Sequence, residues 1–177
     1  MSKLQLKKEL NSMSKDQLAE LVLDLYSARK EIKEYLEFFL NPNVEKLVEK
    51  FRKNVDKELR RSKHGYSKAR VSGLKRMVND VSSFSPGVDT VIDCYLYLIK
   101  ELMYLERYLN LPGALYNGFN YFVEQSILLA DADGYLDKIV TQLNDLANND
   151  GIGRQYFRSH LKSLIQATID SLKSSLS

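Results

Sequence analysis

Two groups of side chains in this sequence have types and spacings that could do chemistry, and the first of them is basic. From Lys50 to Arg76 there are eleven Lys and Arg residues but only two acidic residues, Asp56 and Glu58. Phosphate backbones bind such clusters because each neutralised phosphate releases a counterion. This stretch therefore predicts a surface for nucleic acid or another polyanion. The candidate residues are Lys53, Lys57, Arg60, Arg61, Lys63, Lys68 and Arg70.

A simpler explanation of the same basic residues is a solvated helix face followed by an exposed loop. Lys and Arg side chains are seldom buried, and the apolar face of the helix expected over residues 44–59 is already used for packing. The sequence contains no RNP-like motif and no zinc-finger spacing. Nucleic acid is therefore an alternative partner, and the solvated face is the favoured interpretation.

The second group is a polar stripe on an otherwise apolar segment. Its members follow one another in steps of three and four residues, so they share one face of a helix. Two carboxylates one turn apart, beside phenols and an amine, could line a cleft and shift one another's pKa values. The same stripe would also be expected on the solvent-exposed edge of an otherwise buried helix. The cleft candidates are Asp89, Asp93, Tyr97 and Lys100, with Glu101, Tyr104 and Arg107 beyond them.

Other patterns of catalysis and metal binding are missing from the sequence. There is no P-loop, no G-x-S-x-G motif and no paired-histidine motif. A calcium loop with Gly134 at its glycine position would place Leu129 and Val140 at ligand positions, and neither can coordinate. We therefore predict no catalytic residue, no metal ligand and no cofactor. The sequence favours a non-catalytic protein, and an unrecognised enzyme with a carboxylate site on the 86–109 helix is the second alternative.

The polar stripe belongs to a long helix that is expected from Pro86 to Leu109. Apolar residues cover most of its circumference, so other helices must enclose it on several sides. Ser85 is placed to cap this helix, and Pro86 suits its first position because proline lacks the N–H that would stay unbonded there. The segment is predicted to be the central element of the fold.

The rest of the chain predicts an all-α fold, a single-domain bundle of seven or eight helices. Ser14 to Gln17 has the spacing of a capping box and begins a helix expected to reach Leu40. No stretch alternates with a period of two, so essentially no sheet is expected. Helix pairs that begin near residues 67, 112 and 151 recur at roughly forty-residue spacing, and an irregular α-solenoid of helix pairs is a variant of this prediction.

Composition and charge bound the organisation of the chain. The 177 residues are expected to form one domain, with N-terminal helices and a hairpin over 1–61, a basic connection over 62–72 and core helices over 73–177. Residues 1–80 carry a net charge of +7 and residues 81–177 a net charge of −4. No segment has the apolar length of a signal peptide or a membrane span, so a cytoplasmic protein without membrane association is expected. The single cysteine, Cys94, is expected to be a buried free thiol.

Surplus apolar residues on the segment from Leu18 to Phe39 bear on possible partners. Leu23, Tyr26 and Phe38 lie off its heptad seam. Intramolecular packing is the favoured explanation, and a homodimer or another protein partner is the alternative. The function most consistent with the sequence is that of a non-catalytic helical interaction protein whose partner is unknown.

Three landmarks resemble a family of uncharacterised bacterial proteins that share a domain of unknown function. They are the corner EYLEFFLNPN at residues 34–43, the run from Ser72 to Val81 that leads to Phe84, and the turn DGIG at residues 150–153. The familiar form of the turn continues with an aromatic residue and a second glycine, where this chain has Arg154 and Gln155. The resemblance implies an all-helical fold and supplies no activity, cofactor or catalytic residue.

Overall fold

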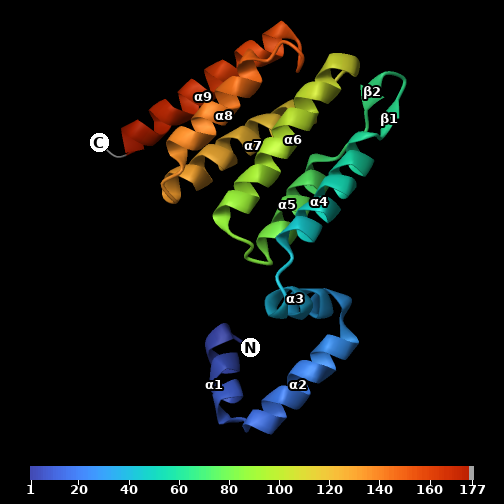
Figure 1. The fold of residues 1–177 in the computed structure, drawn as a ribbon, viewed down its shortest axis with the longest axis vertical. Coiled ribbons are helices and arrows are strands. Elements are labelled where there is room, and N and C mark those ends of the chain that lie inside the picture. Colours follow the sequence, from blue (N-terminus) through green and yellow to red (C-terminus); the bar gives the residue numbers. More distant parts are fainter. Residues whose placement is uncertain (176–177) are drawn as a thin grey trace. The chain divides into compact units, whose positions relative to one another are not determined.

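The computed structural model describes residues 1–175, which form nine helices and one small two-stranded sheet (Figure 1). The predicted all-α class is confirmed, and the predicted number of seven or eight helices is too low for the described residues. The difference arises at Arg29, where the backbone is extended (φ −137°, ψ 119°) and divides the long helix expected to end at Leu40. The predicted capping box is present, since the Ser14 side chain accepts from the Gln17 N–H and the Gln17 side chain accepts from the Ser14 N–H.

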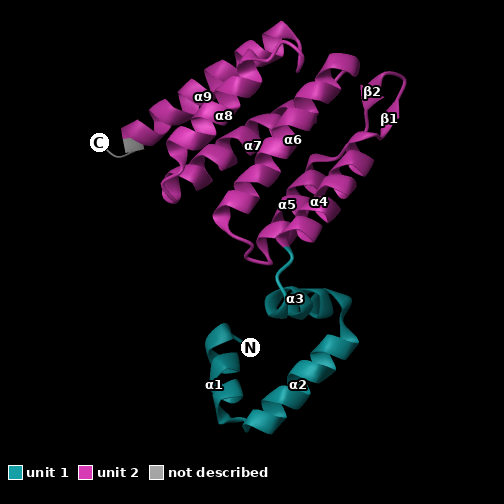
Figure 2. Ribbon diagram, in the orientation of Figure 1, with its two compact units in different colours: residues 1–43 teal, residues 44–177 magenta. Residues whose placement is uncertain are grey.

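The chain divides into two compact units, Met1–Asn43 and Val44–Ser177 (Figure 2). The boundary falls in the EYLEFFLNPN corner, whereas the sequence grouped residues 1–61 together. Unit 1 consists of α1 (Lys3–Ser12), α2 (Lys15–Ala28) and α3 (Lys30–Leu40), and none of their residues is buried. Unit 2 therefore holds the hydrophobic core.

Unit 2 is built from helices that pack as consecutive pairs. Each of the pairs α4/α5, α6/α7 and α8/α9 is in contact, and α6 also packs on α4, α5 and α8, while α7 packs on α8 and α9 (Figure 1). The helices are α4 (Val44–Leu59), α5 (Val71–Ser82), α6 (Val88–Tyr108), α7 (Gly113–Ala132), α8 (Leu136–Asn148) and α9 (Gln155–Ser175).

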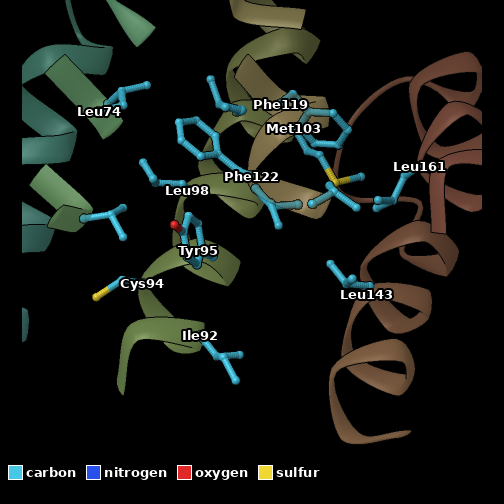
Figure 3. Close-up of a cluster of buried hydrophobic side chains, with 14 of the residues drawn as sticks. Leu74, Ile92, Cys94, Tyr95, Leu98, Met103, Phe119, Phe122, Leu143 and Leu161 are labelled. Carbon is cyan, nitrogen blue, oxygen red and sulfur yellow. The ribbon is translucent and has the colours of Figure 1, made fainter. Parts of the chain in front are cut away.

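The core of unit 2 surrounds α6, as its apolar circumference predicted. Ten of its residues are buried, among them Leu98, Ile99, Leu102 and Met103 with no exposed surface. Figure 3 shows Leu98 and Met103 of α6 close to Phe119 and Phe122 of α7. Because neighbouring helices cover α6 on several sides, only a narrow polar edge of α6 faces the solvent.

The start of α6 differs from the predicted cap. Ser85 has a left-handed backbone (φ 52°) and Pro86 precedes the helix, so the N-cap residue is Gly87 (φ 105°) and no side chain caps the first turn. Glycine is required at this position for two reasons. The positive φ strains any residue with a Cβ, and a Cβ at Gly87 would lie 2.7 Å from the Asp89 Oδ1 atom.

The basic connection contains a β-hairpin that the sequence did not predict. Strands β1 (Ser62–Lys63) and β2 (Tyr66–Ser67) pair antiparallel, and the two turn residues His64 and Gly65 both have positive φ. This is the geometry of a type I′ turn, which suits the twist of a hairpin. Asn110, just after α6, holds the hairpin through two backbone hydrogen bonds, from Ser67 N–H to its carbonyl (3.3 Å) and from its own N–H to the Gly65 carbonyl (3.0 Å). Two-residue strands are too short to show a period of two, so the sequence did not reveal this hairpin, the one small exception among the described residues to the expectation of essentially no sheet.

Candidate functional site

A hollow of about 390 Å³ lies between α4 and α6. It combines parts of both groups that the sequence singled out, because Asp56 and Arg60 come from the basic stretch and Tyr97 comes from the polar stripe. The alignment follows from helical spacing, since residues three and four apart share a face on each helix. The lining residues are Asp56, Leu59 and Arg60 of α4 and Tyr97, Glu101, Tyr104, Leu105 and Tyr108 of α6.

Tyr97 is the residue that joins the two walls of the hollow. Its hydroxyl donates to Asp56 Oδ1 at 2.6 Å, and the Arg52 guanidinium lies 5.3 Å from the centre of its ring. Burial and the hydrogen bond to Asp56 both raise the pKa of the Tyr97 phenol. The phenol therefore stays protonated and donates to Asp56 throughout the neutral range.

Glu101 is the half-buried carboxyl group in the wall of the hollow. Burial and the negative charge of Asp56 raise its pKa above the ordinary value of 4.5, against the lowering effect of Lys100. Within the part of the chain that the structure describes, the Glu101 carboxylate forms no hydrogen bond and no ion pair. The hollow therefore contains a partly desolvated carboxylate that no described residue contacts through a hydrogen bond or an ion pair.

We expect this raised pKa to make stability depend on pH. Because the pKa of Glu101 is higher in the folded state, the ionised group costs folding stability once the pH rises above about 4.5. The variant Glu101→Gln should therefore gain stability relative to the wild-type protein as the pH rises from 4.5 to neutrality. Denaturant unfolding at several pH values measures this difference. When Asp56→Asn is also present, the stability gained by Glu101→Gln should depend less on pH. A stability difference between Glu101→Gln and the wild-type protein that is independent of pH would contradict the prediction.

The other predicted cleft residues lie outside the hollow. Asp89 and Asp93 are exposed in the first two turns of α6, and neither lines the hollow. Lys100 is exposed and does not line the hollow. The Lys100 Nζ atom lies 5.9 Å from the centre of the Tyr104 ring. The carboxylates that meet here are Asp56 and Glu101, which belong to two different helices.

The predicted polyanion-binding residues lie on α4 and on the segment up to α5, and all of them are exposed. Some of them already have acidic partners. Lys53 forms an ion pair with Glu49 at a nitrogen–oxygen distance of 2.7 Å. Glu58 forms ion pairs with Arg61 at 2.6 Å and with Arg70 at 3.6 Å. Glu58 also accepts the Arg70 backbone N–H at 2.8 Å, and these basic contacts outweigh burial and lower its pKa. Among the described residues, no acidic side chain forms an ion pair with the other four candidates, Lys57, Arg60, Lys63 and Lys68, which are all exposed.

A second polar cluster, which sequence reasoning missed, joins α6 to the DGIG turn. Glu106 is 1 % exposed and accepts the Arg154 backbone N–H at 3.0 Å and the Tyr156 hydroxyl. Its Oε1 atom also lies 3.4 Å from the Arg154 guanidinium. Arg107 donates to the carbonyls of residues 150 and 151 at 3.2 and 2.8 Å. These groups are satisfied inside the protein, so the cluster holds the turn against α6. A charged residue on the apolar side of a central helix was the signal that could have revealed it.

Cys94 is buried in α6, as predicted. Burial, assisted by the nearby charge of Asp93, raises the pKa of its thiol to about 12. The thiol is therefore protonated at neutral pH and is a poor nucleophile. In residues 1–175, no three His, Cys, Asp or Glu side chains gather where they could hold a metal ion. The described helices also include none with the length and apolarity that a membrane crossing requires.

The fold thus defines an all-α protein whose second unit is assembled from paired helices around one central helix. The chain belongs to a family of unknown function (DUF6155), whose family model matches residues 1–164. Neither the curated proteins nor the solved structures include a match to this chain. The family membership agrees with the resemblance seen in the sequence and brings no activity with it.

Proposed function

We propose that this chain is a non-catalytic helical interaction protein that binds a partner polypeptide in the hollow between α4 and α6. The observation that carries the proposal is the lining of the hollow, in which three tyrosines stand beside Arg60. Tyrosine and arginine are enriched among the residues that dominate binding at protein interfaces. The tyrosine rings supply large contact areas, and the tyrosine hydroxyls can form hydrogen bonds with the bound segment.

The arrangement of helix pairs supports this proposal. Three consecutive helix pairs, α4/α5, α6/α7 and α8/α9, pack on one another, which supports an irregular α-solenoid. The sequence had grouped the helices differently, into pairs that begin near residues 67, 112 and 151. Solenoids of this kind present extended surfaces to their partners. Tyr104 and Tyr108 are 36 % and 76 % exposed, so a bound segment would bury aromatic surface that now contacts water.

A displayed library of random dodecapeptides tests this function on the full chain. Peptides selected on the wild-type protein should bind the double variant Tyr104→Ala/Tyr108→Ala at least about tenfold more weakly, because interface tyrosines often account for more than 1 kcal/mol each. Tyr135→Ala, an exposed tyrosine just before α8, is the matched control and should bind like the wild-type protein. Fluorescence polarisation measures the affinities. A library without enriched peptides, or peptides that bind the double variant equally well, would refute the proposal.

Binding of a polyanion through the basic stretch is the second candidate function. It is supported by the hairpin, which presents Lys63 and Lys68 near the end of α4, where Lys57 and Arg60 are also exposed. Binding to generic DNA and RNA should weaken linearly with the logarithm of salt concentration. The variant Lys57→Glu/Lys63→Glu/Lys68→Glu should lose this binding, and Lys138→Glu/Lys162→Glu/Lys173→Glu on α8 and α9 should retain it. If no salt-dependent binding occurs even at low ionic strength, this function is excluded.

A second copy of the chain is a further candidate partner. Large apolar side chains of unit 1 are exposed, including Leu23 at 63 %, Phe39 at 68 % and Leu40 at 71 %. Size-exclusion chromatography with light scattering over a range of concentrations tests self-association, and a strictly monomeric species would exclude it. The proposed compartment is the cytoplasm, where an unbridged cysteine such as Cys94 stays reduced.

A further inference from the structure

We infer that the bound polypeptide inserts one lysine or arginine side chain beside Glu101 and that the residues flanking this cation are acidic. The inference rests on the proposed function and specifies the chemistry of the partner. It combines three observations of the hollow, which concern its carboxylates, its rings and its basic rim.

The carboxylates come first. Asp56 and Glu101 line the same hollow, but only Asp56 has a partner in the structure, the Tyr97 hydroxyl at 2.6 Å. The Glu101 carboxylate is half-buried and has no such partner among the described residues. A cationic side chain would supply a charge-assisted hydrogen bond, which is stronger than a neutral one. One positively charged side chain, bound to Glu101, would therefore complement the carboxylates of the hollow.

The aromatic rings favour the same kind of group. The rings of Tyr97 and Tyr104 already have cations near their faces, since Arg52 lies 5.3 Å and Lys100 lies 5.9 Å from the respective ring centres. Ring faces attract ammonium and guanidinium groups through their quadrupole. A divalent metal ion fits less well, because no cluster of three potential ligands occurs in the described residues and this hollow offers two carboxylates.

The rim determines what surrounds the cation. Residues 44–82 carry twelve Lys and Arg residues and five Asp and Glu residues. Arg60 lines the hollow, Arg52 lies 5.3 Å from the centre of the Tyr97 ring, and Lys100 lies 5.9 Å from the centre of the Tyr104 ring. A polycationic segment would be repelled by these side chains, whereas an acidic segment would be attracted to them. A lone cation among acidic residues therefore complements both the wall and the rim.

The composition of the selected dodecapeptides is the first test. Peptides that depend on Tyr104 and Tyr108 should share one Lys or Arg position flanked by Asp or Glu. The most enriched peptide is then synthesised with its basic residue and, separately, with uncharged norleucine at that position. The wild-type protein should bind the norleucine peptide about tenfold more weakly, as expected for a lost hydrogen bond to a charged group.

Glu101→Gln provides the decisive comparison because it keeps the size of the side chain and removes its charge. This variant should bind the two peptides with nearly equal affinity, while Glu124→Gln on α7 should retain the wild-type difference. Circular dichroism confirms that the variants are folded. If tyrosine-dependent peptides show no shared basic residue, or if their preference persists in Glu101→Gln, this inference is overturned and the proposed function stands. If no peptide requires Tyr104 and Tyr108 for binding, this inference and the proposed function are both overturned.

Discussion

Replacing Phe119 with alanine is expected to lower the free energy of unfolding by about 3–5 kcal/mol, as for other fully buried phenylalanines. Phe119 has no exposed surface, and the centre of its ring lies 4.5 Å from that of Phe157 on α9. The ring therefore joins α7 to α9, and Figure 3 shows Phe119 close to Met103 of α6. Its loss removes buried apolar surface and leaves a cavity that the surrounding close-packed side chains fill only in part.

Equilibrium unfolding in denaturant, with circular dichroism as the signal, measures this loss. Phe39→Ala is the matched control, because the same side chain is 68 % exposed on α3. The control should change the free energy of unfolding by about 0.5 kcal/mol or less. Equal effects of the two substitutions would contradict the placement of the core between α6, α7 and α9.

Replacing Glu106 with alanine is expected to cost about 3 kcal/mol of folding stability. Three groups lose their acceptor together, the Arg154 N–H, the Arg154 guanidinium and the Tyr156 hydroxyl. Glu106 is the buried member of these contacts, and its removal eliminates charge-assisted hydrogen bonds and leaves the part-buried Arg154 N–H without its acceptor. The DGIG turn should also become less protected, and hydrogen exchange at residues 150–154 should accelerate more than exchange in α4.

Glu106→Gln separates the charge of this residue from its shape. Burial is the main reason that the pKa of the Tyr156 phenol is raised, and the hydrogen bond and charge of Glu106 raise it further. Removing the charge should therefore lower the pKa of Tyr156, so that the phenol ionises at a less alkaline pH than in the wild-type protein. Ultraviolet absorbance of tyrosinate follows this titration, with Tyr156→Phe identifying the signal. An unchanged titration would show that Glu106 does not act on Tyr156.

The helices of unit 2 were largely predictable, because each follows a local pattern. The apolar positions of α4 predicted its buried face, and Phe51, Val55 and Leu59 are indeed buried. The apolar circumference of α6 predicted its central position for the same reason. The break at Arg29 was not predictable, since apolar spacing continues through it and neither glycine nor proline marks it. The hairpin was missed because its strands have two residues each.

The candidate site was predictable only in part. Spacing along α6 placed Tyr97, Glu101 and Tyr104 on one edge, and all three line the hollow. The same spacing favoured Asp89 and Asp93, which lie beyond it. A helical pattern states which residues share a face, but it does not state how far along that face a neighbouring helix extends.

The amino-acid sequence by itself determined the all-α class, the central place of α6 and the strongly basic segment that includes α4, because periodicity and charge are properties of contiguous residues. Only the tertiary structure decided which polar groups meet. Asp56 reaches Tyr97 across 41 positions of the chain, and Glu106 reaches the Arg154 N–H across 48. Such contacts depend on the rotation and axial position of each packed helix. Those quantities are set when the core side chains interlock, and no short stretch of sequence contains them.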